Sequence, residues 1–176
     1  MTTEKRKKKS TGDANALDML KADHAALTDW FEKVEHALEG RDYDHVRADA
    51  ESLCLALTRH AEIEEALFYP LLRGAGVDDM LDEARIDHRT MRELVVELQA
   101  LDPADPLYGA QMLVLKRCVA LHEKEEEEKL FPLMRKRGLD VLALGRRIVA
   151  FSKGLKADPA CYGGRRSGTT GLVTGD

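Results

Sequence analysis

The spacing of apolar residues predicts four long helices. In residues 17–38, 46–71, 77–98 and 108–133, apolar side chains recur at steps of three and four, so each stretch presents one continuous stripe to a protein interior. A shorter stripe with the same period covers residues 141–155 and predicts a C-terminal helix that lies against the others. The positions between the stripes are mostly polar, as expected for the solvent-facing sides of helices.

Three short polar links separate the four long stretches. They read "EGRDYD", "RGAGVDD" and "LDPADP", and each interrupts the apolar period. Because links of this length favour antiparallel neighbours, we predict an all-α protein: an antiparallel up-down four-helix bundle with a short C-terminal helix. Pro70 and Pro132 fall near the ends of the second and fourth stretches, where proline kinks or stops a helix.

The chain contains an internal repeat. Adding 64 to positions in the first stretch gives the third, so His24 corresponds to His88. Adding 62 to positions in the second gives the fourth, so His60 corresponds to His122. This pattern predicts two copies of one helical hairpin, related by a pseudo-two-fold axis.

Composition divides the chain into three parts. Residues 1–13 carry five Lys or Arg against Glu4 and Asp13 and predict a basic, disordered tail. Residues 156–176 are Gly-rich without a helical period and predict a flexible tail, which leaves 14–155 as the domain. The net charge of −5 includes +3 from residues 1–13, so the remainder carries −8, and an acidic domain does not favour nucleic-acid binding.

Cysteine usage and hydropathy suggest a location for the protein. Cys54, Cys118 and Cys161 show no CxxC spacing, and an odd, sparse count is typical of a reducing compartment. No apolar run reaches the length of a membrane span, and no apolar stretch follows the basic start as it would in a secretory signal. We therefore expect a cytoplasmic protein. Cys118 is interpreted as a small residue at the edge of the core, and Cys161 as an exposed thiol in the C-terminal tail.

Six polar residues interrupt the inward apolar stripes, and they point to chemistry. A buried His or Glu without a partner costs several kcal/mol when charged, so six in one bundle core need a common cause. A metal ion is such a cause, because it binds imidazole and carboxylate together and offsets their loss of hydration. The predicted ligands are His24, His60, Glu64, His88, His122 and Glu126.

The number of donors favours two iron ions over one zinc ion. Each His lies 17 to 19 residues from its hairpin turn, or roughly 25–29 Å along the helix, so the four rings share one height. Zinc sites usually close with four ligands. Two six-coordinate irons need about twelve donor positions, of which four imidazoles and two bridging carboxylates supply about eight. A bridging oxo or hydroxo group adds two, which leaves about two positions for water, O2, peroxide or NO.

These residues resemble a known family. The combination of His24, "HAEIE" (60–64) before "LFYP", His88, and "HEKEE" (122–126) before "KLFP" is similar to the bacterial hemerythrin-like HHE cation-binding domain, over roughly residues 14–155. The resemblance implies an oxo- or hydroxo-bridged di-iron centre in a four-helix bundle. Its ligands, carried over position by position, are the six residues named above.

Two positions depart from the oxygen-carrying members of that family. Those proteins have a further His four residues after the third ligand His, where this chain has Arg92. They also have an Asp where this chain has Glu127, and we predict Glu126 as the ligand because Glu127 lies about 100° round the helix. The missing His favours peroxide chemistry, sensing or iron handling over stable oxygen carriage.

Residues around the predicted site receive simpler interpretations. His36 and His45 are expected at the surface, and Asp23 and Asp87 mostly in solvent, although each could orient a neighbouring group. Six further glutamates are expected to face solvent, with Glu65 or Glu127 able to support a ligand from outside: Glu62, Glu65, Glu123, Glu125, Glu127 and Glu128. An apolar wall should exclude water from the metals: Leu27, Phe31, Leu67, Phe68, Met91 and Phe131.

Three classes of function remain open from the sequence. The chain could bind or sense O2, NO or iron; it could decompose peroxide as a catalase-like enzyme; or it could store iron or donate it in repair. Its expected partner is a small diatomic molecule or peroxide, and no protein partner is indicated. No separate general base or substrate pocket stands out, so the sequence does not decide whether the protein is an enzyme. A ferritin-like site is disfavoured, because those bundles use Glu-x-x-His and this chain uses His-x-x-x-Glu.

Overall fold

The computed structural model describes residues 15–155, and within them all regular structure is helical. This confirms the predicted all-α class. The predicted basic tail, the predicted Gly-rich tail and Cys161 lie outside the described residues. The helices are α1 (Ala16–Glu39), α2 (Tyr43–Ile63), α3 (Asp78–Ala100), α4 (Pro106–Glu125), α5 (Phe131–Lys136) and α6 (Val141–Gly154).

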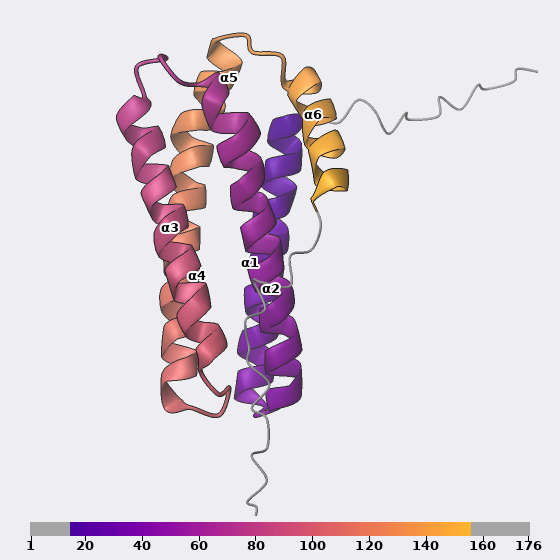
Figure 1. Ribbon diagram of the computed structural model, residues 1–176, viewed down its shortest axis with the longest axis vertical. Helices are drawn as coiled ribbons and strands as arrows, with labels where there is room; N and C mark the ends of the chain where they lie inside the picture. The colour runs from indigo at the N-terminus through magenta and orange to yellow at the C-terminus, as the bar shows by residue number, and fades with distance from the viewer. Residues whose placement is uncertain (1–14, 156–176) are drawn as a thin grey trace, which may run out of the picture.

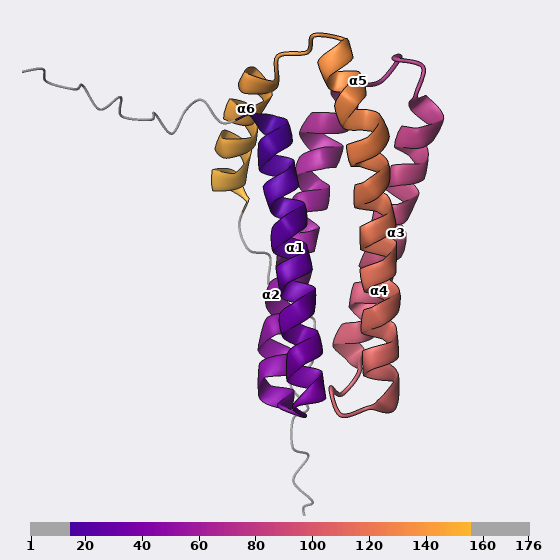
Figure 2. The ribbon, with the colours of Figure 1, turned by 180° about the vertical axis from the view of Figure 1, so that it is seen from behind.

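The long helices are arranged as two hairpins. α1 and α2 lie side by side, as do α3 and α4, and in each pair the second helix returns along the first (Figure 1). The two hairpins stand next to each other and form a helical bundle (Figure 2). α6 lies beside α1, on the side of the bundle away from α3. None of the described helices is long and apolar enough to cross a membrane.

Polar side chains set the beginnings of most helices. Asn15, Asp42, Asp105 and Asp140 each precede a helix, and their side-chain oxygens accept hydrogen bonds from backbone N–H groups of its first turn. Such caps satisfy donors that have no partner within the helix and typically stabilise it by about 1 kcal/mol. α3 is the exception among the described long helices, because it begins after Val77, whose side chain cannot accept a hydrogen bond.

Two apolar clusters fill the bundle, one on each side of a polar layer. The cluster towards the hairpin turns includes Phe31, Leu53 and Met112. The cluster at the opposite end includes Phe68 and Phe131, and α6 packs against it. The six predicted ligands occupy the level between the two clusters, so apolar side chains cover them from above and below.

The second and fourth predicted helices do not continue as plain α-helices to their ends. α2 ends at Ile63 and passes into a π-helical turn, η1 (Glu64–Phe68), and then a short 3₁₀ turn, η2 (Tyr69–Leu71). α4 likewise passes at Glu125 into a π-helical turn, η3 (Glu126–Leu130), which leads into α5. The proline that follows each π turn explains the change, because its ring clashes with the carbonyl four residues earlier and it cannot donate a backbone hydrogen bond. Each π turn begins at a predicted glutamate ligand.

Candidate metal centre

The structure brings all six predicted ligands together in the centre of the bundle. Four helices contribute one imidazole each, and the two π turns contribute the carboxylates of Glu64 and Glu126. All six side chains are buried, with no more than 4% of any residue exposed. π turns often occur at functional sites, because the extra residue rotates one side chain relative to the regular helix. Here each π turn begins at the glutamate that ends a His-x-x-x-Glu segment.

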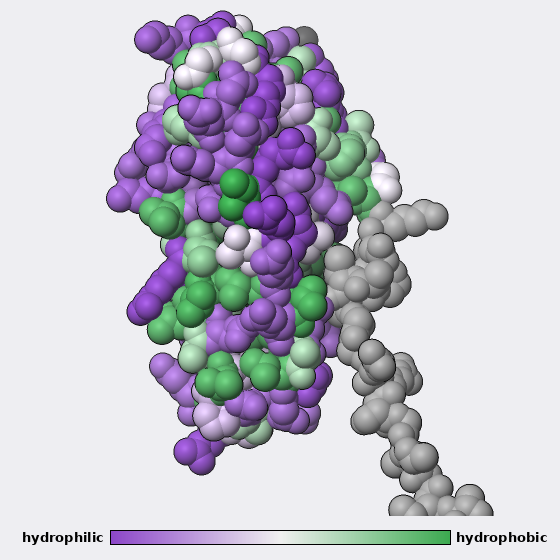
Figure 3. Space-filling view, turned by 60° about the vertical axis from the view of Figure 1, so that its left-hand side comes forward, coloured by the Kyte–Doolittle hydropathy of each residue, from purple (hydrophilic) through white to green (hydrophobic). Residues whose placement is uncertain are grey.

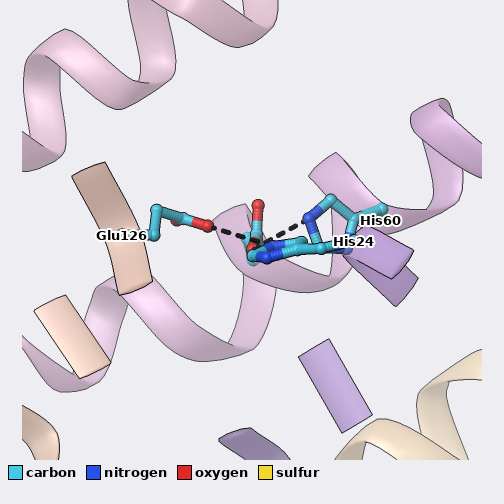
Figure 4. Close-up of side chains that lie close together, drawn as sticks. His24, His60 and Glu126 are labelled. Carbon is cyan, nitrogen blue, oxygen red and sulfur yellow. Dashed lines mark ion pairs between the residues drawn. The ribbon is translucent and has the colours of Figure 1, made fainter. Parts of the chain in front are cut away.

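The first group of side chains comprises His24, His60, Glu64 and Glu126. His60 Nε2 lies 3.1 Å from Glu64 Oε1, and His24 Nε2 lies 3.9 Å from the same oxygen. Glu126 Oε2 approaches His24 Nε2 to 3.6 Å from the opposite hairpin. Figure 4 shows Glu126 pointing towards the two imidazoles. Their ligand atoms are close enough to one another to hold one metal ion.

The second group comprises Glu64, His88 and His122. Glu64 Oε2 lies 3.3 Å from His88 Nε2 and 3.7 Å from His122 Nε2, and the two Nε2 atoms are 3.0 Å apart. Glu64 therefore belongs to both groups, with Oε1 facing the first and Oε2 facing the second. Glu126 Oε2 also lies 3.9 Å from His122 Nε2, so the second carboxylate stands between the groups as well.

The geometry and hydrogen bonding of these residues fit metal ions. Two donors about 2.1 Å from one ion are about 3.0 Å apart at a right angle and at most about 4.2 Å apart across it, and the separations given above lie between 3.0 and 3.9 Å. Among the described residues, seven buried side-chain atoms lack a hydrogen-bond partner, and six of them belong to the first group. Such atoms are costly unless something binds them. A cation at the centre would satisfy the Nε2 and carboxylate atoms of this set together, while His60 Nδ1 faces Asp23 on the outer side.

Two carboxylates outside the groups hold the histidines in place. Glu127 Oε1 lies 2.9 Å from His24 Nδ1, and Glu65 Oε1 lies 2.9 Å from His88 Nδ1. A carboxylate at Nδ1 keeps the proton there and leaves Nε2 free for a metal. Glu127 therefore contacts His24 from outside the cluster, while Glu126 points into it, as the inward stripe predicted.

The other two imidazoles have weaker contacts of the same kind. Asp23 Oδ2 lies 3.7 Å from His60 Nδ1, and Asp87 Oδ2 lies 3.6 Å from His122 Nδ1. Both aspartates are about half exposed, and these distances exceed those of a direct hydrogen bond. The internal repeat thus extends beyond the ligands, because each of the four histidines faces an acidic group at Nδ1.

Arg92 points away from the two groups. Its side chain is 43% exposed, and its guanidinium donates a 2.7 Å hydrogen bond to Glu65 Oε1, the same oxygen that contacts His88. Arg92 therefore takes the position of the missing fifth His without offering a donor to the centre. A cavity of about 10 Å³, enough for roughly one water molecule, lies beside Arg92 and His88 and is otherwise lined mainly by apolar side chains such as Leu57 and Met91.

Tyr69 belongs to the site and was not predicted from the sequence. It is 2% exposed, and its hydroxyl lies 3.4 Å from both Glu64 Oε2 and His88 Nε2. Its ring stacks on His88, as Phe131 stacks on His24 in the other repeat. Burial, followed by the charges of Glu64 and Glu126, raises the pKa of Tyr69, so the phenol keeps its proton. The internal repeat carried a signal for this residue. Adding 62 to position 69 gives position 131, so Tyr69 has a hydroxyl where the related residue, Phe131, has none.

The structure corrects one interpretation and confirms two others. Glu123 was expected to face water, but it is partly buried, and its Oε1 is fully buried without a hydrogen-bond partner. Burial raises the pKa of Glu123 to about 7. The charges of His24, His60 and His122 oppose this shift, so the carboxyl lies close to the buried cluster. His36 and His45 are exposed as predicted. All six residues of the predicted apolar wall are buried.

Without a metal, protons hold the cluster together. Burial alone would lower the pKa of His24, but hydrogen bonds with Glu126 and Glu64 raise it to about 11. The same opposition raises the pKa of His60 to about 10, chiefly through the charge of Glu64. Burial also tends to raise the pKa of Glu64, but the surrounding histidines lower it well below its usual value. Burial and the Glu64 charge raise the pKa of Glu126.

These shifts predict how the metal-free protein responds to pH. His24 and His60 have folded-state pKa values above 6.5, so their stabilisation is complete below pH 6.5 and is lost as pH rises towards about 10 and 11. We expect the free energy of unfolding of chelator-treated protein to fall by several kcal/mol over this range. Urea unfolding at a series of pH values measures it. The exposed His36→Gln variant should show the same decline, whereas a curve that stays flat in the wild type would contradict the prediction.

Comparisons with known proteins agree with the site. The sequence model described as Hemerythrin HHE cation binding domain matches residues 15–134, more than half of the chain. The chain is 25% identical over 123 residues to a DNA nickase of Nostoc sp., a match that covers 70% of this chain but 34% of that protein. It therefore spans about a third of the nickase's length.

Two mycobacterial proteins are similar over more of their length. Uncharacterized proteins of Mycobacterium bovis and Mycobacterium tuberculosis are each 28% identical to this chain over 118 residues, which is 67% of this chain and 71% of theirs. No solved structure matches the chain. The buried histidine and glutamate cluster fits metal binding, and the family match covers all six of its residues. The chain therefore belongs to the hemerythrin HHE cation-binding domain family.

Proposed function

We propose that this protein is a hemerythrin-like, non-haem di-iron protein that binds or reacts with O2, NO or peroxide. Its two hairpins would form an antiparallel up-down four-helix bundle around the irons. The proposed ligands are His24, His60, Glu64, His88, His122 and Glu126. The observation that carries the proposal is the position of Glu64, whose two oxygens face two separate sets of imidazoles. One ion would leave one of these sets without a partner.

The donor set favours iron over zinc. A single zinc site usually closes with four ligands, whereas here six residues share one buried layer. Imidazole and carboxylate together suit iron, and a carboxylate between two groups is suited to bridging a pair of ions. Bound iron would supply the redox chemistry, because it changes oxidation state and accepts small ligands at open positions.

The protein's own residues would select and orient the ligand. Phe68 and Phe131 pack against each other at 5.5 Å and cover one end of the centre, which excludes bulk water. The small cavity beside His88 has room for a molecule the size of water or a diatomic gas but not for an organic substrate. Stress defence, gas sensing and iron handling are the roles that such a centre could serve.

Tyr69 favours peroxide decomposition as the alternative function. Its neutral hydroxyl can donate a hydrogen bond to Glu64 Oε2, or to a ligand held beside His88. A proton donor at that position is what cleavage of peroxide requires, and the absence of a fifth His leaves space for the ligand. A catalase-like activity would make the protein an enzyme, with Tyr69 holding the proton at its hydroxyl oxygen.

One set of measurements tests the proposal and separates the alternatives. We expect about two irons per chain after anaerobic loading, as the two donor groups imply. The absorption spectrum of the reduced protein should then be followed on adding O2, and separately H2O2. A stable, reversible change with O2 indicates a carrier or sensor, whereas rapid H2O2 loss with gas evolution indicates a catalase-like enzyme. Fewer than one iron per chain, with His60→Ala and His122→Ala as stable as the wild type, would contradict the di-iron centre.

A further inference from the structure

The outer face of α4 carries an apolar stripe that no described part of the chain covers. Leu107, Val114 and Leu121 follow one another at intervals of seven residues, so they lie along one side of the helix. Their exposed fractions are 63%, 45% and 63%. The space-filling view of the face over α3 and α4 shows apolar side chains gathered on it (Figure 3). A heptad of exposed apolar residues is typical of a helix that packs against another helix.

The stripe lies on the α3 side of α4. The buried residue Leu115 marks the inward direction of α4, and Gln111 reaches α3 through a 2.6 Å hydrogen bond to Glu97. Leu107 and Val114 flank Gln111 on its outer side. Across the seam, α3 contributes the exposed Ile86. The apolar surface therefore spans both helices of the hairpin, and α6 lies against α1 instead.

Charges of opposite sign stand on the two helices at one height. The bond from Gln111 to Glu97 and the contact of His122 with Asp87 show which residues of α3 and α4 lie side by side. Because the two helices run in opposite directions, residues at the same height have numbers with a constant sum, here 208 or 209. Glu93 and Arg117 sum to 210 and so lie at nearly the same height. Each is five residues from a ligand histidine, about 140° round its helix, and therefore points outwards.

We propose that this surface, the outer face of α3 and α4, binds the same face of a second copy of the chain. The two-fold axis would run parallel to the helices, which places α3 of each copy over α4 of the other. Glu93 then faces Arg117 of the second copy, and this contact occurs twice. Ile86 then lies opposite Leu121, so apolar surface meets apolar surface at that end of the interface. A two-fold axis perpendicular to the helices would instead place α4 of one copy over α4 of the other, and both charge pairs would be lost.

The available area suits a weak dimer. Helices of this length are about 30 Å long, and two of them are about 20 Å wide, so each copy could bury about 600 Å². This is somewhat below the roughly 800 Å² per partner of a standard interface. We therefore expect a dissociation constant in the micromolar range, about 1–100 µM. The proposal does not depend on the chemistry of the metal centre.

Sedimentation velocity of the full-length protein between about 5 and 500 µM tests the interface across that range. We expect a concentration-dependent dimer in the wild type and a monomer in the Leu107→Glu/Leu121→Glu variant, with unchanged helicity by circular dichroism. Val96→Glu is the matched control. Val96 is 65% exposed but lies one turn after Arg92, on the α2 side of α3, so this variant should dimerise normally.

A charge exchange tests the orientation. Glu93→Arg and Arg117→Glu should each weaken dimerisation at least about tenfold, because each places like charges together twice. Combining them restores both pairs with reversed sign and should restore most of the affinity. A wild type that stays monomeric at the highest concentration, or a Val96→Glu variant that disrupts the dimer as strongly as the stripe variant, would overturn the proposed surface. A double variant weaker than either single variant would overturn the proposed axis.

Discussion

Replacing Glu64 with glutamine should remove both ions of the proposed metal centre. Glu64 Oε1 faces His60 and Oε2 faces His88, so this side chain belongs to both donor groups. An amide keeps the shape of the side chain, but it carries no negative charge and offers one oxygen instead of two. We expect metal content to fall from about two ions per chain to well below one, measured by elemental analysis after anaerobic loading and desalting.

Two further variants serve as comparisons for Glu64→Gln. His60→Gln removes a donor from the first group alone, so about one ion per chain should remain in the second group. Glu62→Gln changes an exposed glutamate two residues from Glu64 and should leave the metal content unchanged. Retention of two ions by Glu64→Gln, or loss of both ions from His60→Gln, would contradict the arrangement of two groups joined by one carboxylate.

Removing the metal should strongly destabilise the fold. The proposed ions would bind the folded cluster but not an unfolded chain, so each would contribute about 4 kcal/mol when its free concentration is 1,000 times the dissociation constant. Two ions then contribute about 8 kcal/mol. For a domain of this size, that corresponds to roughly 15–30 °C in the midpoint of thermal unfolding. Calorimetry of the loaded protein before and after exhaustive chelation measures the shift.

The control for chelation is the Glu64→Gln variant itself. The Glu64→Gln variant should hold little metal, so chelator should change its unfolding temperature by no more than a few degrees. The His36→Gln variant should respond to chelator as the wild type does. Equal unfolding temperatures of loaded and chelated wild-type protein would mean that the bundle is stable without its ions. The protons on His24 and His60 would then be sufficient to hold the buried carboxylates.

The location of the site follows from the division of the core. The apolar clusters on either side are held by residues such as Phe31 and Phe131, which are at most 2% exposed. They tolerate a polar layer between them because its members pair with one another and with acidic groups outside. The same packing keeps the four histidines close to one height, so the centre is preorganised before a metal arrives.

Much of this protein could be predicted from its sequence. The periods of three and four indicated the long helices, and the offsets of 64 and 62 related His24 to His88 and His60 to His122 without any knowledge of tertiary contacts. The preference for Glu126 over Glu127 also followed from helix geometry, because 100° of rotation separates an inward from an outward position. Periodicity reports which side of a helix is buried, and that information sufficed to identify the six buried residues of the polar layer.

The π turns and Tyr69 could not be predicted in the same way. A π turn depends on how the chain accommodates Pro70 or Pro132 while packing against neighbouring helices, and local sequence does not contain those neighbours. Tyr69 follows such a turn, so the regular helical period no longer gives its direction. Glu123 was misjudged for a related reason, because its burial depends on how the helices pack and not on its position along α4.

The sequence by itself determined the helices, the repeat and the six residues of the polar layer, because these depend on the order of side chains along single helices. The tertiary structure decided how the layer divides. Contacts between helices place Glu64 in both donor groups. They also place Glu65 at Nδ1 of His88 and Glu127 at Nδ1 of His24. Arg92 is turned outwards, where it binds Glu65. Distances of 3–4 Å between residues a hundred positions apart depend on how helices pack, and no period along the chain specifies them.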